Sequence, residues 1–322
     1  MIELPQRRLG ETGPWISVIG IGCNNFGRAG TVTESFEGTR LVVDAAIRWG
    51  ITFFDTAEMY GQPPGTSELL LGEALRKRDR ESVVIATKWG HQAAHAHGAE
   101  TWGPKGARHY IRNAVDASLR RLQTDYIDLY QFHTPDPDTP IADTLGALQE
   151  LITEGKILHI GHTNFTAEQM IEANEAAANG FTPFISAQND YSLLNRAPET
   201  AILPEVESAG MGFLPYYPLA NGLLTGKYTR DRPPAGSRLV ELKPQLLDST
   251  DWSQLQAFQQ LCDDAGITML QASMGWLLSH RMLTSVIAGA TSPEQVKANA
   301  ETARTELPND VLDAMEDLFP AP

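Results

Sequence analysis

The stretch ITFFDTAEMYG (residues 51–61) begins as a short apolar run, stops at Asp55 and reaches Tyr60 five residues later. Two later runs have the same form: VVIATK ends at Lys88 and IDLYQFH ends at His133. Short apolar runs of this kind are typical of parallel strands that are buried on both faces. In a barrel of alternating strands and helices, the C-terminal strand ends gather on one face, which carries the chemistry. The three runs therefore predict a barrel with these four polar residues on that face.

The four side chains differ in a way that indicates acid–base chemistry. A phenol is a poor acid at neutral pH unless a cation stands beside it. A lysine that is held by a carboxylate is such a cation, which gives Lys88 and Asp55 a part beside Tyr60. Taken singly, each residue could equally satisfy loop backbone or pack at a strand end. Their occurrence together, in order and at strand ends, favours the functional interpretation.

The remaining chain repeats the rhythm of strand, loop and helix, which predicts an α/β fold of the (β/α)8 TIM barrel type. We expect strands at residues 18–22, 52–55, 83–88, 127–133, 158–163, 184–188, 212–217 and 285–289. Helical patterns occupy residues 39–49, 67–77, 107–122, 141–154, 167–178, 271–279 and 293–302. Ser67 is expected to cap the second of these helices. RRLGETGPWIS (residues 7–17) predicts a β-hairpin that closes the barrel floor.

No linker rich in Pro, Gly or Ser divides the chain, so residues 1–322 are expected to form a single domain. The longest irregular stretches are residues 91–106, 190–199 and 220–253. The first and the last of these follow predicted barrel strands. We therefore expect both to lie over the active face and to shape a pocket there.

Composition narrows the class of function. The net charge of −15 opposes binding to nucleic acid or to an anionic membrane surface. No apolar stretch approaches the ~18 residues of a membrane helix, and the charged start MIELPQRRLGET does not resemble a signal peptide. Cys23 and Cys262 are too few for a disulfide framework. A cytoplasmic protein with a small-molecule partner is the expectation.

Five segments carry a resemblance to a known family. FFDTAEMYG, IATKWG, SLRRLQTDYIDLYQFH, GKILHIGHTNF and YYPLANGLLTGKY resemble, in the same order, the successive signatures of the aldo-keto reductase superfamily, in its bacterial type. The resemblance implies a (β/α)8 barrel and nicotinamide-dependent reduction of aldehydes and ketones. It makes Tyr60 the general acid–base, Lys88 the group that lowers its pKa, Asp55 the partner of Lys88, and His133 the group that orients the carbonyl.

The resemblance also implies a cofactor site, although GIGCNNFG (residues 20–27) lacks the G-x-G-x-x-G spacing of a Rossmann fold at Asn25. Thr163, Asn164 and Gln188 would hold the carboxamide, with Thr163 replacing the usual serine. Tyr216 would stack on the nicotinamide, and Tyr217 departs from the usual serine. The other expected cofactor residues are Cys23, Asn24, Pro218, Leu219, Gly222, Lys227, Arg238, Gly289, Thr291, Gln295 and Asn299. For Cys23 we favour a small core residue over a reactive thiol.

Cofactor preference follows from the last motif, IAGATSPEQVKAN. Many family members have a lysine and an arginine near Gly289 and Gln295 that grip the 2′-phosphate of NADP(H), and this chain has neither. Other branches with the same Gly…Gln…Asn pattern use NADP(H). NADP(H) is therefore favoured, with NAD(H) as the alternative, and Arg238 is expected to supply a positive charge.

The substrate pocket is expected to include Asn25, Phe26, Trp89 and Trp102. A loop with His91, His95 and His97 has the spacing H-x₃-H-x-H, but no cysteine or well-spaced carboxylate completes a set, so no metal is expected. The predicted function is NADP(H)-dependent reduction of carbonyl compounds. An NAD(P)-dependent aldose dehydrogenase acting on sugars and a non-catalytic, cofactor-binding regulatory subunit are the alternatives. The physiological substrate, the preferred direction and the oligomeric state stay open.

Overall fold

Eight parallel strands form the sheet at the centre of the molecule. The computed structural model describes residues 3–92, 99, 101–230, 234 and 237–322; the side chains of Arg238 and Leu242 also lie outside the described part. The strand order is β10-β3-β4-β5-β6-β7-β8-β9. The bounds are β3 Ile19–Gly22, β4 Phe53–Asp55, β5 Val84–Trp89, β6 Ile127–Phe132, β7 Ile157–Thr163, β8 Ser186–Gln188, β9 Gly212–Phe213 and β10 Val286–Gly289. Each predicted strand is present.

The sheet closes between its two outer strands, β9 and β10. A bridge joins Phe213 to Leu283, and the amide of Thr284 donates a 2.9 Å hydrogen bond to the carbonyl of Phe213. The amide of Ile287 donates to the carbonyl of Pro215 at 3.2 Å. With helices between the strands, this arrangement is the (β/α)8 fold that the sequence predicts.

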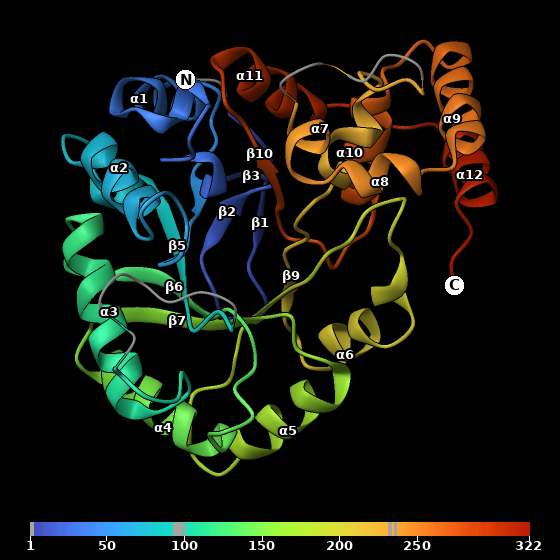
Figure 1. Ribbon diagram of the computed structural model, residues 1–322. Coiled ribbons are helices and arrows are strands. Elements are labelled where there is room, and N and C mark those ends of the chain that lie inside the picture. Colours follow the sequence, from blue (N-terminus) through green and yellow to red (C-terminus); the bar gives the residue numbers. More distant parts are fainter. Residues whose placement is uncertain (1–2, 93–98, 100, 231–233, 235–236) are drawn as a thin grey trace.

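Helices surround the strands, and α1 to α6 follow one another around the outside of the sheet (Figure 1). Helices α9 and α12 lie side by side. The bounds are α1 Phe36–Arg48, α2 Thr66–Leu75, α3 Arg108–Leu122, α4 Ile141–Thr153, α5 Ala167–Ala177, α6 Ile202–Ser208, α7 Arg238–Leu242, α8 Pro244–Asp248, α9 Trp252–Asp264, α10 Met269–Ser279, α11 Pro293–Thr302 and α12 Asn309–Leu318. Short 3₁₀ turns are η1 Cys23–Asn25, η2 Val32–Glu34, η3 Arg80–Ser82, η4 Ala197–Glu199 and η5 Ala220–Thr225. None of the helices formed by described residues combines the length and the apolar character that a membrane crossing needs.

The expected cap at Ser67 is wrong, for a reason that concerns the site. Helix α2 starts one residue earlier, after Gly65, whose φ of 93° turns the chain into the helix. The hydroxyl of Ser67 instead donates to the carbonyl of Cys23 at 2.8 Å and lies 2.9 Å from the hydroxyl of Thr56. Ser67 thus ties α2 to the turns that follow β3 and β4.

The N-terminal hairpin is confirmed. Strands β1 (Gln6–Arg8) and β2 (Trp15–Ser17) pair antiparallel, and the amide of Glu11 at the turn donates to the carbonyl of Gly210 just before β9. Leu9 and Ile16 are fully buried against a cluster of barrel residues. The hairpin therefore covers the N-terminal ends of the strands and leaves the opposite ends for the site.

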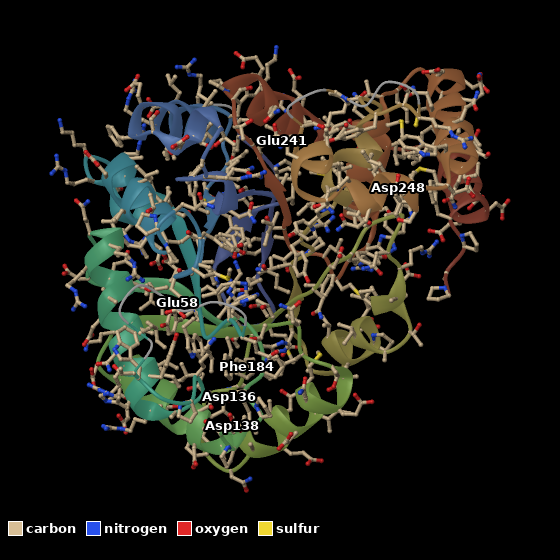
Figure 2. All side chains as sticks on the ribbon, in the orientation of Figure 1. Glu58, Asp136, Asp138, Phe184, Glu241 and Asp248 are labelled. Carbon is tan, nitrogen blue, oxygen red and sulfur yellow. The ribbon has the colours of Figure 1, made fainter. Side chains whose placement is uncertain are left out.

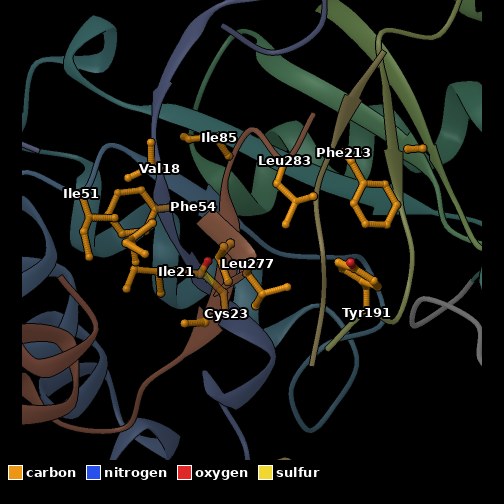
Figure 3. Packing of buried hydrophobic residues seen from close by; sticks show 14 of the residues in the cluster. Val18, Ile21, Cys23, Ile51, Phe54, Ile85, Tyr191, Phe213, Leu277 and Leu283 are labelled. Atoms are coloured by element: carbon orange, nitrogen blue, oxygen red, sulfur yellow. The ribbon is translucent and has the colours of Figure 1, made fainter. Parts of the chain in front are cut away.

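The segment between β9 and α9 is more regular than expected. Residues 220–253 contain η5, α7 and α8 rather than an irregular loop, and Leu239 of α7 is fully buried. Helices of five residues span too little chain to give a periodic pattern, which is why the sequence did not indicate them. The core of the molecule includes Cys23, which packs among residues such as Ile21 and Leu277 (Figure 3).

Candidate active site

A buried ion pair lies at the centre of the strand ends. Lys88 Nζ is 2.5 Å from Asp55 Oδ2 and donates to the carbonyl of Thr56 at 3.0 Å. Both side chains are almost completely buried. The other carboxylate oxygen, Oδ1, accepts hydrogen bonds from Gln131 Nε2 at 3.0 Å and Gln188 Nε2 at 3.1 Å. The pair is thus held on several sides, as a buried charge requires.

Tyr60 and His133 lie beside this pair. Lys88 Nζ is 5.1 Å from the centroid of the Tyr60 ring, and the rings of Tyr60 and His133 are 5.8 Å apart in an edge contact. Tyr60 follows the β4 strand by one turn, and His133 directly follows β6. The structure therefore brings the four residues predicted to be catalytic together at one end of the barrel.

His133 is held in its neutral form. Burial, followed by the charge of Lys88 and by His91 and Lys105, holds its pKa well below the usual range. Its Nδ1 is buried without a hydrogen-bond partner among the described residues. A neutral imidazole can donate one hydrogen bond, which suits the orientation of a carbonyl oxygen.

A cavity of about 790 Å³ opens over these residues. Asp55, Tyr60 and His133 are in its wall, whereas Lys88 lies behind Asp55 and is not. Most residues that the sequence assigns to cofactor binding also line it: Asn24, Thr163, Asn164, Gln188, Tyr216, Pro218, Leu219, Gly222, Lys227, Gly289, Thr291, Gln295 and Asn299. Its lining residues range from Asp55 at the end of β4 to Gln295 in the first turn of α11.

Between β7 and β9, the side chains that line the cavity are joined by hydrogen bonds. Asn164, at a φ of 62°, donates to the carbonyl of His133 at 2.9 Å and accepts from the hydroxyl of Tyr216 at 2.7 Å. The hydroxyl of Thr163 also donates to the carbonyl of His133. The amide nitrogen of Gln188 is committed to Asp55 and Gln131, which leaves its carbonyl oxygen for any further contact.

The opposite end of the cavity is built around the start of α11. The hydroxyl of Ser292 accepts from the amide of Gln295 at 3.3 Å, and Gln295 Oε1 accepts from the amide of Thr291 at 2.8 Å. Asn299 is 4% exposed, lines the cavity, and its Nδ2 has no partner among the described residues. Such a buried amide donor fits a polar ligand group, and Lys227 supplies a positive charge in the same wall.

Between the two ends runs the loop after β9, in which several residues have positive φ. Tyr217 has a φ of 53°, Asn221 of 58° and Gly222 of 102°. Lys243 Nζ lies 4.5 Å from the ring centroid of Tyr217 and donates to Asn221 Oδ1 at 3.3 Å. Glu241 of α7, labelled in Figure 2, also lines the cavity. The side chain of Arg238, a predicted cofactor contact, lies outside the described part.

Several predicted residues lie behind the wall rather than in it. Cys23 is fully buried in the core, where burial and then Asp55 raise the pKa of its thiol, as expected for a core residue. Phe26 is also fully buried. Trp89 stacks with both Tyr130 and Phe132, with ring centroids 4.5 and 4.8 Å away.

The predicted substrate pocket is corrected accordingly. Of its four residues, only Asn25 is in the cavity wall. Trp89 follows the inward-facing Lys88, so its side chain points to the opposite face of the sheet, toward the helices. Trp102 is partly buried with its ring edge-on to Tyr110, 5.4 Å away. Phe26 and Trp89 act as packing residues here.

The structure adds residues that the sequence interpretation passed over. Gln131 is two positions before His133 in a strand, so its inward direction could have been read from the alternation of side chains. Glu58 is buried between α3 and the end of β5 (Figure 2), where it accepts from the amide of Gly90 at 2.7 Å and from the hydroxyl of Tyr110 at 3.1 Å. Burial raises the pKa of Glu58 to about 7. Arg28 and His91 are in the cavity wall.

The histidine loop is described only in part. His95 and His97 lie outside the described residues, whereas the ring of His91 is 4.7 Å from that of His133. Within the described ranges, no group of three or more His, Cys, Asp or Glu side chains has the arrangement of a metal site.

Comparisons with known proteins agree with this geometry. A model of the Aldo/keto reductase family matches residues 18–319. The chain is 30% identical over 310 residues to the L-glyceraldehyde 3-phosphate reductase of Escherichia coli (strain K12), covering 93% of this chain and 87% of that protein. It is 34% identical over 323 residues to the NADH-specific methylglyoxal reductase of the same strain, covering 93% of each. It is 31% identical over 305 residues to a probable voltage-gated potassium channel subunit beta of Arabidopsis thaliana, covering 91% of this chain and 89% of that protein. With the family model spanning nearly the whole chain and the paired lysine and aspartate lying beside a tyrosine and a histidine, the protein belongs to the aldo/keto reductase family and is an NAD(P)H-dependent oxidoreductase.

Proposed function

We propose that this enzyme reduces small aldehydes and ketones to alcohols with NADP(H), and that Tyr60 is its proton donor. One observation carries the proposal: the buried Lys88–Asp55 pair lies beside Tyr60 and His133, at the wall of one cavity. Small aldehydes fit this space, and two of the similar proteins are named as reductases of small aldehydes.

The proton chemistry follows from the arrangement of the side chains. The nicotinamide supplies a hydride to the carbonyl carbon when the cofactor is bound. His133, neutral and buried, donates a hydrogen bond to the carbonyl oxygen and orients it. Tyr60 gives its proton to the same oxygen as negative charge develops there. Lys88 stabilises the resulting phenolate, and Asp55 fixes the position of the ammonium group.

The residues around the cavity fit a dinucleotide. The unpartnered Asn299 amide and Gln295 lie at the first turns of α11, and Lys227 lies in the loop after β9. We place the carboxamide near Thr163 and Asn164, and the diphosphate near Leu219, Gly222 and Lys227. Backbone amides in a glycine-containing loop together with a lysine suit a diphosphate. The preference for NADP(H) rests on the Gly…Gln…Asn pattern shared with NADP(H)-using branches and on the expected charge of Arg238, and NAD(H) is the alternative.

A panel of carbonyl compounds and sugars, assayed with NADPH and with NADH, tests the proposal. We expect turnover of small aldehydes in the reductive direction and a higher kcat/KM with NADPH. Oxidation of sugars in the absence of aldehyde reduction would favour an aldose dehydrogenase. Tight cofactor binding without turnover of any substrate would favour a regulatory subunit, an alternative that the similarity to a probable channel subunit keeps relevant. A single domain and a cytoplasmic location remain predictions.

A further inference from the structure

His91 lies in the cavity wall next to the proposed reaction centre, yet the proposed chemistry gives it no part. Its ring centroid is 4.7 Å from that of His133, with the ring planes at 74°. Tyr60 contacts His133 with a centroid separation of 5.8 Å. All three side chains line the same space. The wall therefore has a third polar side chain, His91, next to His133, which with Tyr60 would bind a carbonyl oxygen.

The backbone on both sides of His91 is fixed against the chain that carries His133. The amide of His133 donates to the carbonyl of Trp89 at 2.8 Å. The hydroxyl of Thr134 donates to the carbonyl of Gly90 at 3.0 Å and accepts from the amide of Gln92 at 3.0 Å. These bonds set the two segments in register, so His91 keeps its position relative to His133.

Gly90 gives the turn that directs His91 into the cavity. Its φ is 78°, a conformation that favours glycine, and a Cβ atom here would lie 2.9 Å from Cε2 of Phe132. The amide of Gly90 is held by Glu58, and Lys105 Nζ donates to the carbonyl of His91. Hydrogen bonds with Glu58, Lys105 and Thr134 therefore hold the backbone of residues 90–92, which carries the imidazole.

The imidazole of His91 is suited to neutral hydrogen bonding. Burial, followed by the charge of Lys105, lowers its pKa from the usual 6.5. A neutral imidazole has one donor and one acceptor nitrogen. It can accept a hydrogen bond from a hydroxyl group or donate one to a carbonyl oxygen, whereas an alkyl chain forms no hydrogen bond with it.

We propose that His91 binds an oxygen on the carbon next to the reacting carbonyl and so selects α-oxygenated aldehydes, namely 2-hydroxyaldehydes and 2-oxoaldehydes. The inference rests on the proposed reductase function. With ring centroids 4.7 Å apart in the wall of one cavity, the two imidazoles are near enough for one small substrate to contact both. His133 binds the reacting oxygen and His91 the second one.

Steady-state kinetics with a matched pair of substrates, 2-hydroxypropanal and propanal, tests the inference in two variants. His91→Phe keeps a ring but removes both nitrogens, and we expect kcat/KM for 2-hydroxypropanal to fall about tenfold, the equivalent of one ordinary hydrogen bond. For propanal it should change less than about twofold. His91→Asn retains a donor and an acceptor, and should recover part of the loss. His109→Phe, at an exposed position on α3, is the matched control and should leave both substrates unchanged.

A binding measurement separates recognition from turnover. Inhibition by 1,2-propanediol should weaken in His91→Phe relative to inhibition by 1-propanol, and cofactor affinity, measured by fluorescence titration, should not change. Equal losses for both aldehydes would overturn the inference and make His91 a support for His133. Unchanged kinetics for both aldehydes would show that His91 only lines the cavity, and would also overturn the inference. Absence of turnover in the wild type with either aldehyde would instead overturn the reductase function, and the inference with it.

Discussion

Gln131 Nε2 donates a 3.0 Å hydrogen bond to Asp55 Oδ1, the carboxylate oxygen that does not contact Lys88. The carboxylate thus has one oxygen bound to the ammonium group and the other bound to amides of β6 and β8. Because rotation of the carboxylate would break all of these contacts, the ammonium group is confined to one place beside Tyr60. This confinement is what the proposed chemistry needs, and it makes the roles of the pair testable.

Tyr60→Phe should abolish most turnover and leave cofactor binding nearly intact. The change removes the proton donor and keeps the ring that contacts His133. General acid catalysis typically contributes ~10²–10⁴-fold to the rate. Measuring kcat with a simple aldehyde and cofactor affinity by fluorescence checks both parts. A variant that keeps more than about a tenth of the wild-type kcat would remove Tyr60 from the mechanism.

Lys88→Met should also reduce turnover strongly, with a loss that depends on pH. Without the ammonium group 5.1 Å from its ring, the phenolate of Tyr60 forms only in more alkaline solution. Alcohol oxidation needs the phenolate, so its rate should recover partly as the pH rises. The measurement is the pH profile of oxidation from pH 7 to 11. A flat profile for the residual activity would show that Lys88 does not act through Tyr60.

Arg238→Ala should weaken NADPH much more than NADH. A hydrogen bond to a charged group contributes ~1.5–3 kcal/mol, so we expect a roughly ten- to hundredfold loss of NADPH affinity. Fluorescence titration measures both cofactors, and Arg281→Ala, at an exposed position before β10, is the control. Equal weakening of the two cofactors would assign Arg238 to the diphosphate. No change in either would leave the NADP(H) preference without support from Arg238.

Glu58→Gln should raise the free energy of unfolding, relative to that of the wild type, more at pH 8 than at pH 5. Burial raises the pKa of Glu58 to about 7 in the folded state, whereas the unfolded carboxyl titrates near its ordinary value of 4.5. Between these two values the folded state holds a proton that the unfolded state has lost. The contribution of Glu58 to stability is therefore complete below pH 4.5 and is lost as the pH rises through about 7.

Glutamine keeps the acceptor oxygen for Gly90 and Tyr110 and has no such titration. The difference in unfolding free energy between variant and wild type should grow by up to about 3 kcal/mol from pH 5 to pH 8. Urea unfolding at the two pH values measures it, with Glu172→Gln, exposed on α5, as the control. A difference that is the same at both pH values would show that Glu58 is ionised throughout this range.

The strands were predictable from the sequence because most of them are short apolar runs, and three of these runs lead directly to Asp55, Lys88 and His133. Helix α9 was not predicted, although Asp251 caps it and its buried residues Leu255, Phe258 and Cys262 recur with helical spacing. The short helices α7 and α8 were not predictable, because they give no repeat. The assignment of Trp89 to the pocket ignored its alternation with Lys88, which places it on the other face.

The cofactor residues were reached by resemblance rather than from the residues themselves. No pattern within the sequence joins Thr163 to Asn299, which are far apart in the chain and line one cavity only because the barrel closes. His91 was named in the sequence for its spacing to His95 and His97. Its approach to His133 depends on the φ of Gly90 and on hydrogen bonds between two loops. Neither feature can be predicted from the composition or the periodicity of the sequence.

The closure between β9 and β10 has a consequence for amide hydrogen exchange. Among the described residues, β9 contributes a strand of only two residues, and a single bridge with a few hydrogen bonds joins it to the β10 side. Segments with few cross-strand hydrogen bonds open at low free energy, so the amides there should exchange sooner than those of β6. Tyr216 and Gly289, which flank this junction, both line the cavity. A dinucleotide that contacts both would bridge the two strand ends and raise the free energy of opening there. Its addition should slow amide exchange at residues 212–217 and 283–289 and leave the exchange rates of β6 unchanged.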